Sequence, residues 1–363
     1  MYKYEFIDWH QVTNNFAQHK DVNTRLIYGK KSDHIPLITI AIPAYKRADL
    51  LKEGLDSIMR QKNFTDFEVM VIDDYSEGSE EMDQLMEEYT NRYHNISCYR
   101  NDKNIGMGAN WNRCIELTRS KWLVLLHDDD MLCDNFLEKV YPIAEATQCS
   151  LAGVFQYKLK QIDDNGKSGE KYIKRLSKAQ TILSKSRKGK AFQIKTTDLF
   201  KFIQPSPGCW IINRNKAIEL GGYDVNRMKS GIIDGPFNFK NTYHAKTIII
   251  PQLLSIRRFK ENDFLREDAQ IEILCGIYNY VRHFIDEYGK YRKWHKLELD
   301  ISIMYFIIGL KAKYNSKVDF SPYLDQFGVS NVVRRLPDIA IRYLDYLLMV
   351  GLIFRKEPIV KRK

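Results

Sequence analysis

Four chemically reactive residues follow one strongly apolar stretch of the chain. Residues 122–126 are Trp-Leu-Val-Leu-Leu, and His127, Asp128, Asp129 and Asp130 come directly after them. Three adjacent carboxylates repel one another, so at the end of a buried strand they need a positive partner. Mg²⁺ or Mn²⁺ would serve, because these cations bind one or two protein carboxylates together with phosphate oxygens. The run therefore favours metal-assisted chemistry on a phosphorylated substrate, with a solvated acidic turn as the alternative.

Polar residues also follow two earlier apolar runs. Tyr45 and Arg47 come at the end of the run 37–45, and Asp73 and Asp74 close the run 67–74. In open α/β sheets, ligands bind beyond the carboxyl ends of the strands. We therefore expect these residues and the acidic run to converge on one crevice.

Apolar periodicity predicts the elements that position these residues. Strands alternate with helices at the spacing of βαβ units, which predicts a parallel sheet with helices on both faces. From about residue 262 the pattern becomes helical and aromatic. The expected strands are 37–45, 67–74, 96–102 and 121–130, and the expected helices are 49–61, 80–93 and 108–120.

The composition limits the class of protein. Of 363 residues, 44% are hydrophobic and 28% are charged, which is typical of a globular chain. The net charge of +10 favours an acidic partner such as a nucleotide or a membrane surface. Six cysteines without a C-x-x-C pair indicate reduced thiols in a cytosol. The chain has no signal-peptide pattern and no apolar run long enough for a spanning helix, so we expect a cytoplasmic protein.

Three segments, in this order and spacing, closely resemble family 2 glycosyltransferases with the GT-A fold. They are "TIAIPAYKR", "FEVMVIDDYS" and "NIGMGANWNRCIELTRSKWLVLLHDDDM". The resemblance is strong over 37–140 and looser over 207–224 and 231–259. It implies a Rossmann-like, mostly parallel sheet flanked by helices, and sugar transfer with inversion from a nucleotide-sugar donor. The implied domains are an N-terminal extension (1–34), a GT-A domain (35–260) and a helical C-terminal region with a basic tail (261–363).

The same resemblance implies roles for individual residues. Asp74 would accept a hydrogen bond from the base, and Asp234 takes the place of the general base. Asp129 is the first choice for the metal carboxylate, with Asp130 beside it, and Asp128 or Asp130 would touch the ribose or the metal. The implied nucleotide-binding residues are Pro43, Ala44, Tyr45, Arg47, Asp74, Asn104, Gly106 and Asp128.

The chain departs from the family at four places. Ile233 precedes Asp234 where the family often has Glu, and Trp111 replaces a common Arg. His127 lies where an acid is frequent, and we expect a His whose hydrogen bonds are satisfied, with a partner behind the ligands as the alternative. A His often found near the later strand is absent. Positive charge for the diphosphate could come from Arg257, Arg258 or Lys260, and the alternative bases are Asp224 and the acids within 263–268.

We expect an inverting transferase that moves a sugar from a UDP-sugar, with Mn²⁺ or Mg²⁺, to a hydroxyl of a glycan or lipid-linked acceptor in bacterial surface polysaccharide synthesis. The alternative is a non-catalytic GT-A-like module that binds a nucleotide-sugar or a glycan. A dinucleotide enzyme is excluded because the first strand lacks G-x-G-x-x-G after it. No nucleic-acid-binding module is visible, so we expect no nucleic-acid partner.

Two further segments leave alternatives open. The basic stretch 158–190 is either a solvated loop or a lid or acceptor element. The apolar stretch 339–354 precedes a tail with five basic residues. This pattern fits either an interfacial helix on anionic lipids or a helix docked on protein. An interfacial helix would place the protein on the inner face of the cell membrane.

Overall fold

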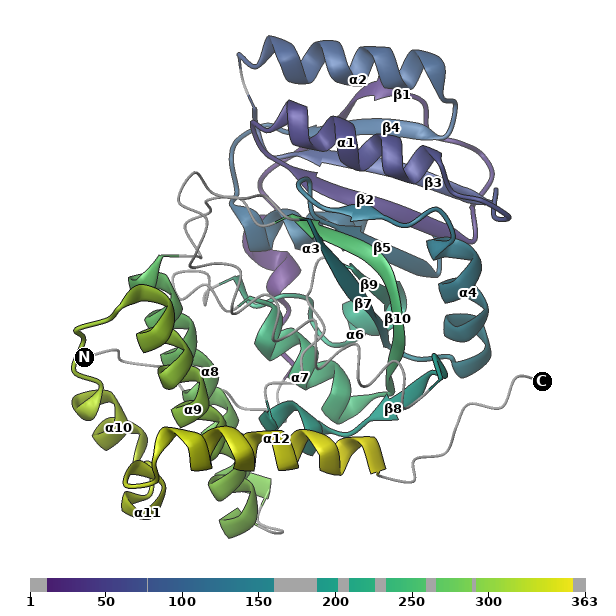
Figure 1. The fold of residues 1–363 in the computed structure, drawn as a ribbon. Coiled ribbons are helices and arrows are strands. Elements are labelled where there is room, and N and C mark those ends of the chain that lie inside the picture. Colours follow the sequence, from purple (N-terminus) through teal and green to yellow (C-terminus); the bar gives the residue numbers. More distant parts are fainter. Residues whose placement is uncertain are drawn as a thin grey trace.

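The computed structural model describes residues 12–76, 78–159, 188–201, 209–225, 233–258, 266–288 and 292–354. One mixed sheet of ten strands runs through this part of the chain, with helices on both of its faces (Figure 1). The strand order is β1-β4-β3-β2-β5-β9-β7-β10-β6, and β8 pairs with β10. The expected α/β class is confirmed.

The centre of the sheet is parallel. The strands β2 (Ile38–Ala44), β3 (Phe67–Asp73), β4 (Ile96–Asn101) and β5 (Trp122–Leu126) pair in the order β4-β3-β2-β5. The helices α1 (Ala48–Met59), α2 (Glu80–Arg92) and α3 (Met107–Leu117) connect them. Every residue of β5 is buried, because helices cover both faces of a parallel sheet. The predicted strand starts near 37, 67 and 121 are therefore confirmed.

Antiparallel strands extend the sheet on both sides. β1 (Thr24–Gly29), from the segment before residue 35, pairs with β4 at one edge. β9 (Cys209–Asn213) lies antiparallel between β5 and β7 (Leu151–Leu159). β10 (Thr247–Arg258) is parallel to β7, and the short strands β6 (Met131–Leu132) and β8 (Phe192–Ile194) are antiparallel to β10.

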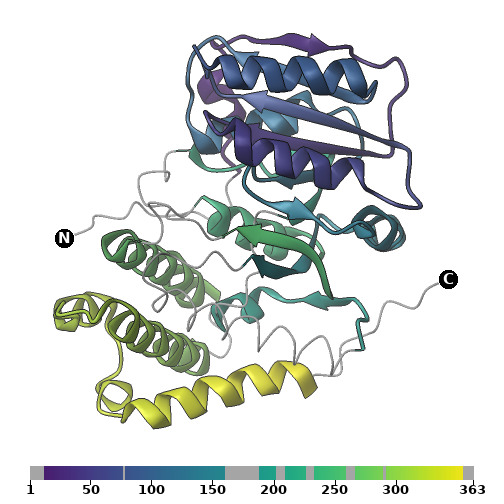
Figure 2. The same ribbon diagram turned by 45° about the horizontal axis from the view of Figure 1, so that its top comes forward.

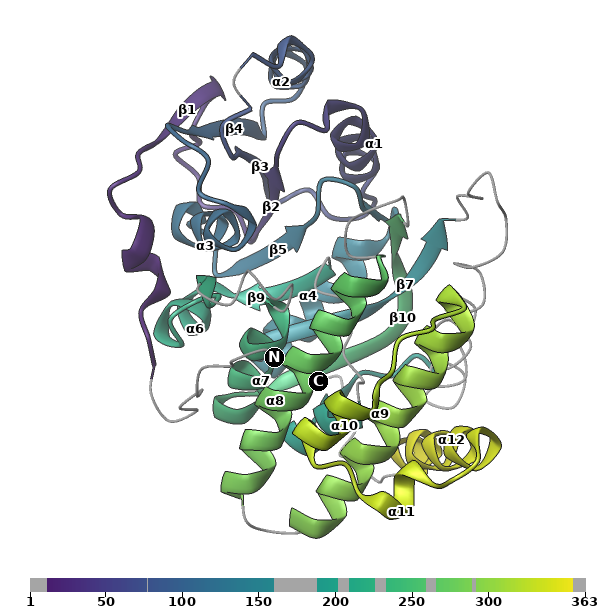
Figure 3. The same ribbon diagram turned by 90° about the vertical axis from the view of Figure 1, so that its left-hand side faces the viewer.

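The alternation of side chains along the strands divides the core into two layers. One layer holds Ile40 and Val71 with α1, α2 and α4 (Phe136–Thr147). The other holds Ala41 and Ile72 with α3, α6 (Arg214–Glu219) and α7 (Asp234–His244). Figure 3 shows α1 and α3 on opposite sides of the parallel strands. Two 3-10 turns, η1 (Asn15–His19) and η2 (Thr196–Lys201), also lie in the described part of the chain before residue 260.

The C-terminal region is helical, as expected. It contains α8 (Glu267–Tyr288), α9 (Arg292–Tyr314), α10 (Ser321–Phe327), α11 (Asn331–Arg334) and α12 (Asp338–Phe354). Leu274 of α8 and Leu299 of α9 belong to the same apolar cluster as Ile249 of β10. The domain boundaries at 34/35 and 260/261 stay predictions.

Two further expectations concern membranes and the basic stretch. No described helix is long and apolar enough to cross a membrane. Most of the stretch 158–190 lies outside the described residues, so neither reading of it is tested.

Candidate active site

The carboxyl ends of the central strands bring the predicted residues to one edge of the sheet. The backbone N–H of Asp74, after β3, donates to the carbonyl of Ala44, at the end of β2, over 2.9 Å. The backbone N–H of Tyr45 donates to the carboxylate of Asp128, after β5. The three loops are therefore held together by hydrogen bonds. Pro43 and Ala44 end β2, and the Tyr45 ring beyond them is 42% exposed.

Asp74 organises the loop that leads into α3. Its buried carboxylate accepts hydrogen bonds from the backbone N–H groups of Ile105 (2.9 Å) and Gly106 (2.8 Å), and from Asn101 Nδ2 (2.8 Å). Asn104 Nδ2 donates to the Asp74 carbonyl over 3.1 Å. Gly106 has φ +84°, a conformation that favours glycine. Asp74 thus shapes the loop predicted to lie under a nucleotide, while its contact with a base stays a prediction.

Arg47 supplies the positive charge that two of the adjacent carboxylates need. Its guanidinium pairs with both oxygens of Asp128, with Nε 3.1 Å from Oδ2. Its Nη1 also lies 3.1 Å from Asp129 Oδ2. Burial raises the pKa of Asp128 to about 7, and the charge of Arg47 opposes that rise. Arg47, predicted to contact the nucleotide, is in this structure the counter-ion of the acidic run.

His127, Asp129 and Asp130 form a cluster whose ligand atoms all lie within 4.8 Å of one another. Asp130 Oδ1 accepts from the backbone N–H of Arg258 over 3.0 Å. His127 Nε2 and Asp130 Oδ2 are buried, and neither atom has a hydrogen-bond partner in the described part of the chain. Buried polar atoms are rarely left unpaired, and these two atoms belong to adjacent members of the cluster, so both are available to bind a ligand.

The protonation of the cluster suits a divalent cation. Burial lowers the pKa of His127 to about 4, so the ring is neutral at pH 7 and keeps a lone pair for a metal. Burial, reinforced by Asp129, raises the pKa of Asp130 to about 7. A cation would favour the ionised carboxylate, and one imidazole with two carboxylates is a set that suits Mn²⁺. The residues present therefore fit the cation that the sequence predicts.

His127 differs from the expectation of a His whose hydrogen bonds are satisfied, because its buried Nε2 has no partner in the described part of the chain. The alternative role behind the ligands stays a prediction. Trp111 stacks on the ring of His127, with centroids 5.1 Å apart and planes at 28°. Tyr223 in turn meets Trp111 edge-on, with centroids 5.0 Å apart. Trp111, which replaces the family's common Arg, thus orients the imidazole by packing. A His joined to three acids at a strand end is the sequence signal for this cluster.

Asp234 begins α7, where the positive end of the helix favours a carboxylate. The side chain is half-buried, and burial raises its pKa while the charge of Arg257 lowers it. Arg257 also acts electrostatically on His127 and Asp130, so its charge connects Asp234 with the cluster of His127, Asp129 and Asp130. Ile233, in place of the family's second acid, is 2% exposed and belongs to the core.

The other candidates for positive charge differ in their surroundings. Arg258 is buried and its Nη2 pairs with Glu53, while its buried Nε has no hydrogen-bond partner in the described part of the chain. Lys260 and residues 263–265 lie outside the described residues.

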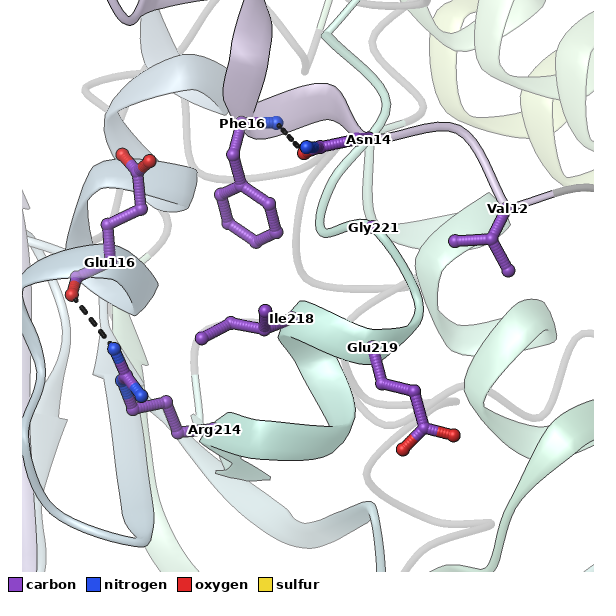
Figure 4. A pocket seen from close by; sticks show the side chains of 8 residues that line it. All are labelled: Val12, Asn14, Phe16, Glu116, Arg214, Ile218, Glu219 and Gly221. Carbon is purple, nitrogen blue, oxygen red and sulfur yellow. Dashed lines mark hydrogen bonds between the residues drawn. The ribbon is translucent and has the colours of Figure 1, made fainter.

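A separate surface pocket lies between η1, the end of α3 and α6 (Figure 4). Phe16, Ile218 and Gly221 line it, and the guanidinium of Arg214 donates to the carbonyl of Glu116 over 3.2 Å. It contains none of the predicted site residues. The acidic cluster, rather than this pocket, is therefore the candidate site.

The comparison with protein families decides the identity of the chain. The model of "Glycosyl transferase family 2" matches residues 39–221, which include β2, the acidic run and β9. The chain belongs to this family. The resemblance to family 2 glycosyltransferases is thus confirmed. The matched span of this glycosyltransferase contains every predicted site residue except Asp234.

Relatives of this family 2 member share short segments with it. An uncharacterised glycosyltransferase of Methanocaldococcus jannaschii, MJ1057, is 27% identical over 111 residues, which are 30% of this chain and 38% of that protein. The poly(ribitol-phosphate) beta-glucosyltransferase of Bacillus spizizenii is 29% identical over 131 residues, which are 36% of this chain and 20% of that protein. The chain therefore spans well under half the length of both relatives.

The fold is shared more widely than the sequence. The crystal structure of S. aureus TarS 1-349 in complex with UDP-GlcNAc superposes with a TM-score of 0.57 and 15% identity. The match covers 87% of this chain and 88% of that one. At this identity the likeness shows the fold alone, which is GT-A.

Proposed function

We propose that this family 2 glycosyltransferase moves a sugar, with inversion, from a UDP-sugar to a hydroxyl group of a glycan or lipid-linked acceptor. The observation that carries the proposal is the cluster of His127, Asp129 and Asp130 at the carboxyl edge of the sheet, with its two unpartnered buried atoms. A donor diphosphate beside this cluster would complete the coordination of a cation. The Bacillus relative is a poly(ribitol-phosphate) beta-glucosyltransferase, which supports a surface polysaccharide as the acceptor.

Each group of residues has a role in this proposal. Mn²⁺ or Mg²⁺, held by His127, Asp129 and Asp130, would supply Lewis-acid stabilisation of the departing diphosphate. The loop ordered by Asp74 would support the nucleotide, together with Asn104 and Gly106. The proposed nucleotide site also includes Pro43, Ala44, Tyr45, Arg47 and Asp128.

Asp234 is the proposed general base. Its carboxylate would take the proton of the acceptor hydroxyl as that oxygen attacks the sugar carbon. The attack comes from the face opposite the diphosphate, so the configuration at that carbon inverts. The apolar Ile233 beside it leaves Asp234 without a second acid on its N-terminal side.

We further propose that the protein works in the cytoplasm and associates with an anionic membrane surface, where lipid-linked acceptors lie. The support is the net charge of +10 and the basic residues after 354.

The proposal is tested by donor binding and turnover measured on the same protein. Mn²⁺ with UDP should raise the melting temperature, because a ligand at 100 times its Kd stabilises the native state by about 2.7 kcal/mol. The double variant Asp129→Ala, Asp130→Ala should lose this gain. The matched control Glu80→Ala, Glu81→Ala removes two acids from the start of α2 and should keep it.

Turnover separates the enzyme from the alternative. Incubation with UDP-sugars and Mn²⁺ should release UDP, and a hydroxyl acceptor should accelerate the release. Saturable binding without any UDP release would instead identify a non-catalytic nucleotide-sugar-binding module. If Mn²⁺ with UDP raises the melting temperature of the Asp129, Asp130 double variant as much as that of the wild type, the cation binds elsewhere.

A further inference from the structure

The helix α12 carries two apolar faces, and only one of them is used inside the protein. Ile341 is fully buried and packs with Leu344 and Leu348 against Ile301 and Ile308 of α9. Figures 1 and 2 both show α12 along the outer edge of the molecule, beyond α9. The inner face therefore docks the helix on its own chain, which is one of the two alternatives for this segment.

The second face of α12 is an exposed apolar stripe. Ile339 is 78% exposed, Tyr343 61%, Tyr346 53% and Leu347 43%. Their spacing of four, three and one residues places them on one side of a helix. Val332 of the neighbouring α11 is 71% exposed. Single exposed apolar residues need no explanation, but a stripe of this kind indicates an interaction surface.

The charges around the stripe favour an anionic partner. From residue 331 to 363 the sequence has eight Lys or Arg against three Asp or Glu. Arg335, which follows α11, is exposed and lies four residues before Ile339 in the sequence, and five of the eight basic residues follow α12. Two copies of so basic a segment repel each other, whereas a membrane rich in anionic lipid attracts it.

The side chains of the stripe suit the boundary between water and lipid. Tyrosine rings prefer this zone because they combine an apolar ring with a polar hydroxyl group. Ile339 and Leu347 supply apolar surface that can enter the acyl region while the helix lies in the plane of the interface. Because α12 lies at an edge of the molecule, its full length can reach such a surface without unfolding.

We infer that the stripe of Ile339, Tyr343, Tyr346 and Leu347, with Val332, is the surface by which this protein docks on anionic membranes. This inference rests on the proposed membrane association and assigns it to a folded face of α12, in addition to the basic tail. It is independent of the transfer chemistry.

The test is co-sedimentation with vesicles of phosphatidylcholine, with and without phosphatidylglycerol. The variant Ile339→Ser, Tyr343→Ser, Leu347→Ser should bind the anionic vesicles at least about tenfold more weakly than the wild type. The matched control Ile27→Ser, Ile35→Ser, Leu37→Ser removes three exposed apolar side chains far from α12 in the sequence and should bind normally. Thermal melting of each variant checks its folding.

A second readout covers the case in which the triple variant fails to fold. Tyr343→Trp keeps the stripe apolar and adds a fluorophore to the five native tryptophans. The difference between the emission of the variant and that of the wild type should shift to shorter wavelength on vesicles. An unshifted emission on vesicles that bind the protein would overturn the inference.

The other outcomes separate the inference from the proposals above. If deletion of 355–363 abolishes binding while the triple serine variant binds normally, the tail alone carries the association and the stripe does not. If the wild type does not bind vesicles, the proposed membrane association is wrong. The proposed transferase activity is then still tested by UDP release in solution. If light scattering shows a wild-type dimer that the triple variant loses, the stripe binds a second copy instead.

Discussion

Asp234 is the residue for which chemistry and position make the sharpest prediction. Asp234→Asn keeps the size of the side chain but cannot accept a proton. UDP affinity should persist, because the proposed nucleotide contacts come from other loops, while sugar transfer should fall by about 10² to 10⁴-fold. The measurements are UDP binding by calorimetry and transfer by UDP release. Loss of both would show that Asp234 is structural, and retention of both would place the base elsewhere.

The raised pKa of Asp234 adds a pH dependence to the same residue. Only the carboxylate form accepts the proton, and burial raises its pKa above the usual carboxyl value. The transfer rate should therefore rise with pH through that raised pKa and level off above it. The residual transfer rate of Asp234→Asn, measured over the same pH range, should not show this rise with pH.

Arg47 leads to a different prediction, since its guanidinium pairs with the carboxylates of Asp128 and Asp129 beside the proposed metal. Replacing it as Arg47→Gln leaves Asp128 and Asp129 without their counter-ion. The metal-free variant should melt at a lower temperature than the wild type, and Mn²⁺ alone should raise that temperature by more than in the wild type. The control is Arg60→Gln, whose side chain pairs with Asp134 on the surface. An equal Mn²⁺ response in wild type and Arg47→Gln would contradict competition between Arg47 and the cation.

At the scale of elements, the loop between β4 and α3 depends on Asp74. An Asn there offers one oxygen, and its amide group would face the N–H of Ile105 or Gly106. Asp74→Asn should therefore lower the free energy of unfolding by about 1 to 3 kcal/mol, the cost of an unsatisfied buried group. Urea denaturation measures this, with Asp102→Asn as the control, because Asp102 makes an exposed pair with Arg25.

The same variant tests whether this loop supports the nucleotide. UDP affinity should fall together with stability, because the loop that holds Asn104 and Gly106 loses its anchor. If UDP binds Asp74→Asn as tightly as the wild type, the loop does not contact the nucleotide. If stability is unchanged, the hydrogen bonds of Asp74 contribute less than their geometry indicates.

At the scale of the whole molecule, the C-terminal helices and the sheet share one core. Tyr278 of α8 and Ile303 of α9 pack in the same cluster as Phe239 of α7 and Ile249 of β10. Deleting 261–363 would expose this surface to water. The truncated protein should therefore aggregate or melt without a cooperative transition, measured by size-exclusion chromatography and calorimetry. The deletion of 355–363 is the control and should melt like the full chain, whereas a soluble, cooperative 1–260 would show an independent domain.

The sequence by itself determined the order of the elements between residues 37 and 130 and the edge of the sheet where the candidate site residues meet. Continuous apolar runs such as 122–126 must be buried, and helical spacing between them leaves a parallel sheet as the solution. Polar residues after such strands must then meet at one edge, which is why the sequence alone predicts that Tyr45, Arg47, Asp74 and Asp128 lie close together. The family followed from the same motifs.

Only the tertiary structure decided the pairing of side chains within that edge. The sequence shows four adjacent polar residues after β5, but their directions depend on the turn that follows the strand. That turn sends Asp128 to Arg47 and leaves the His127 ring beside Asp129 and Asp130. The stack of Trp111 on His127 likewise joins residues that lie 16 positions apart in the chain. The spacing of apolar residues in the sequence determines which residues of each element are buried. Contacts between distant segments form only when the layers pack together.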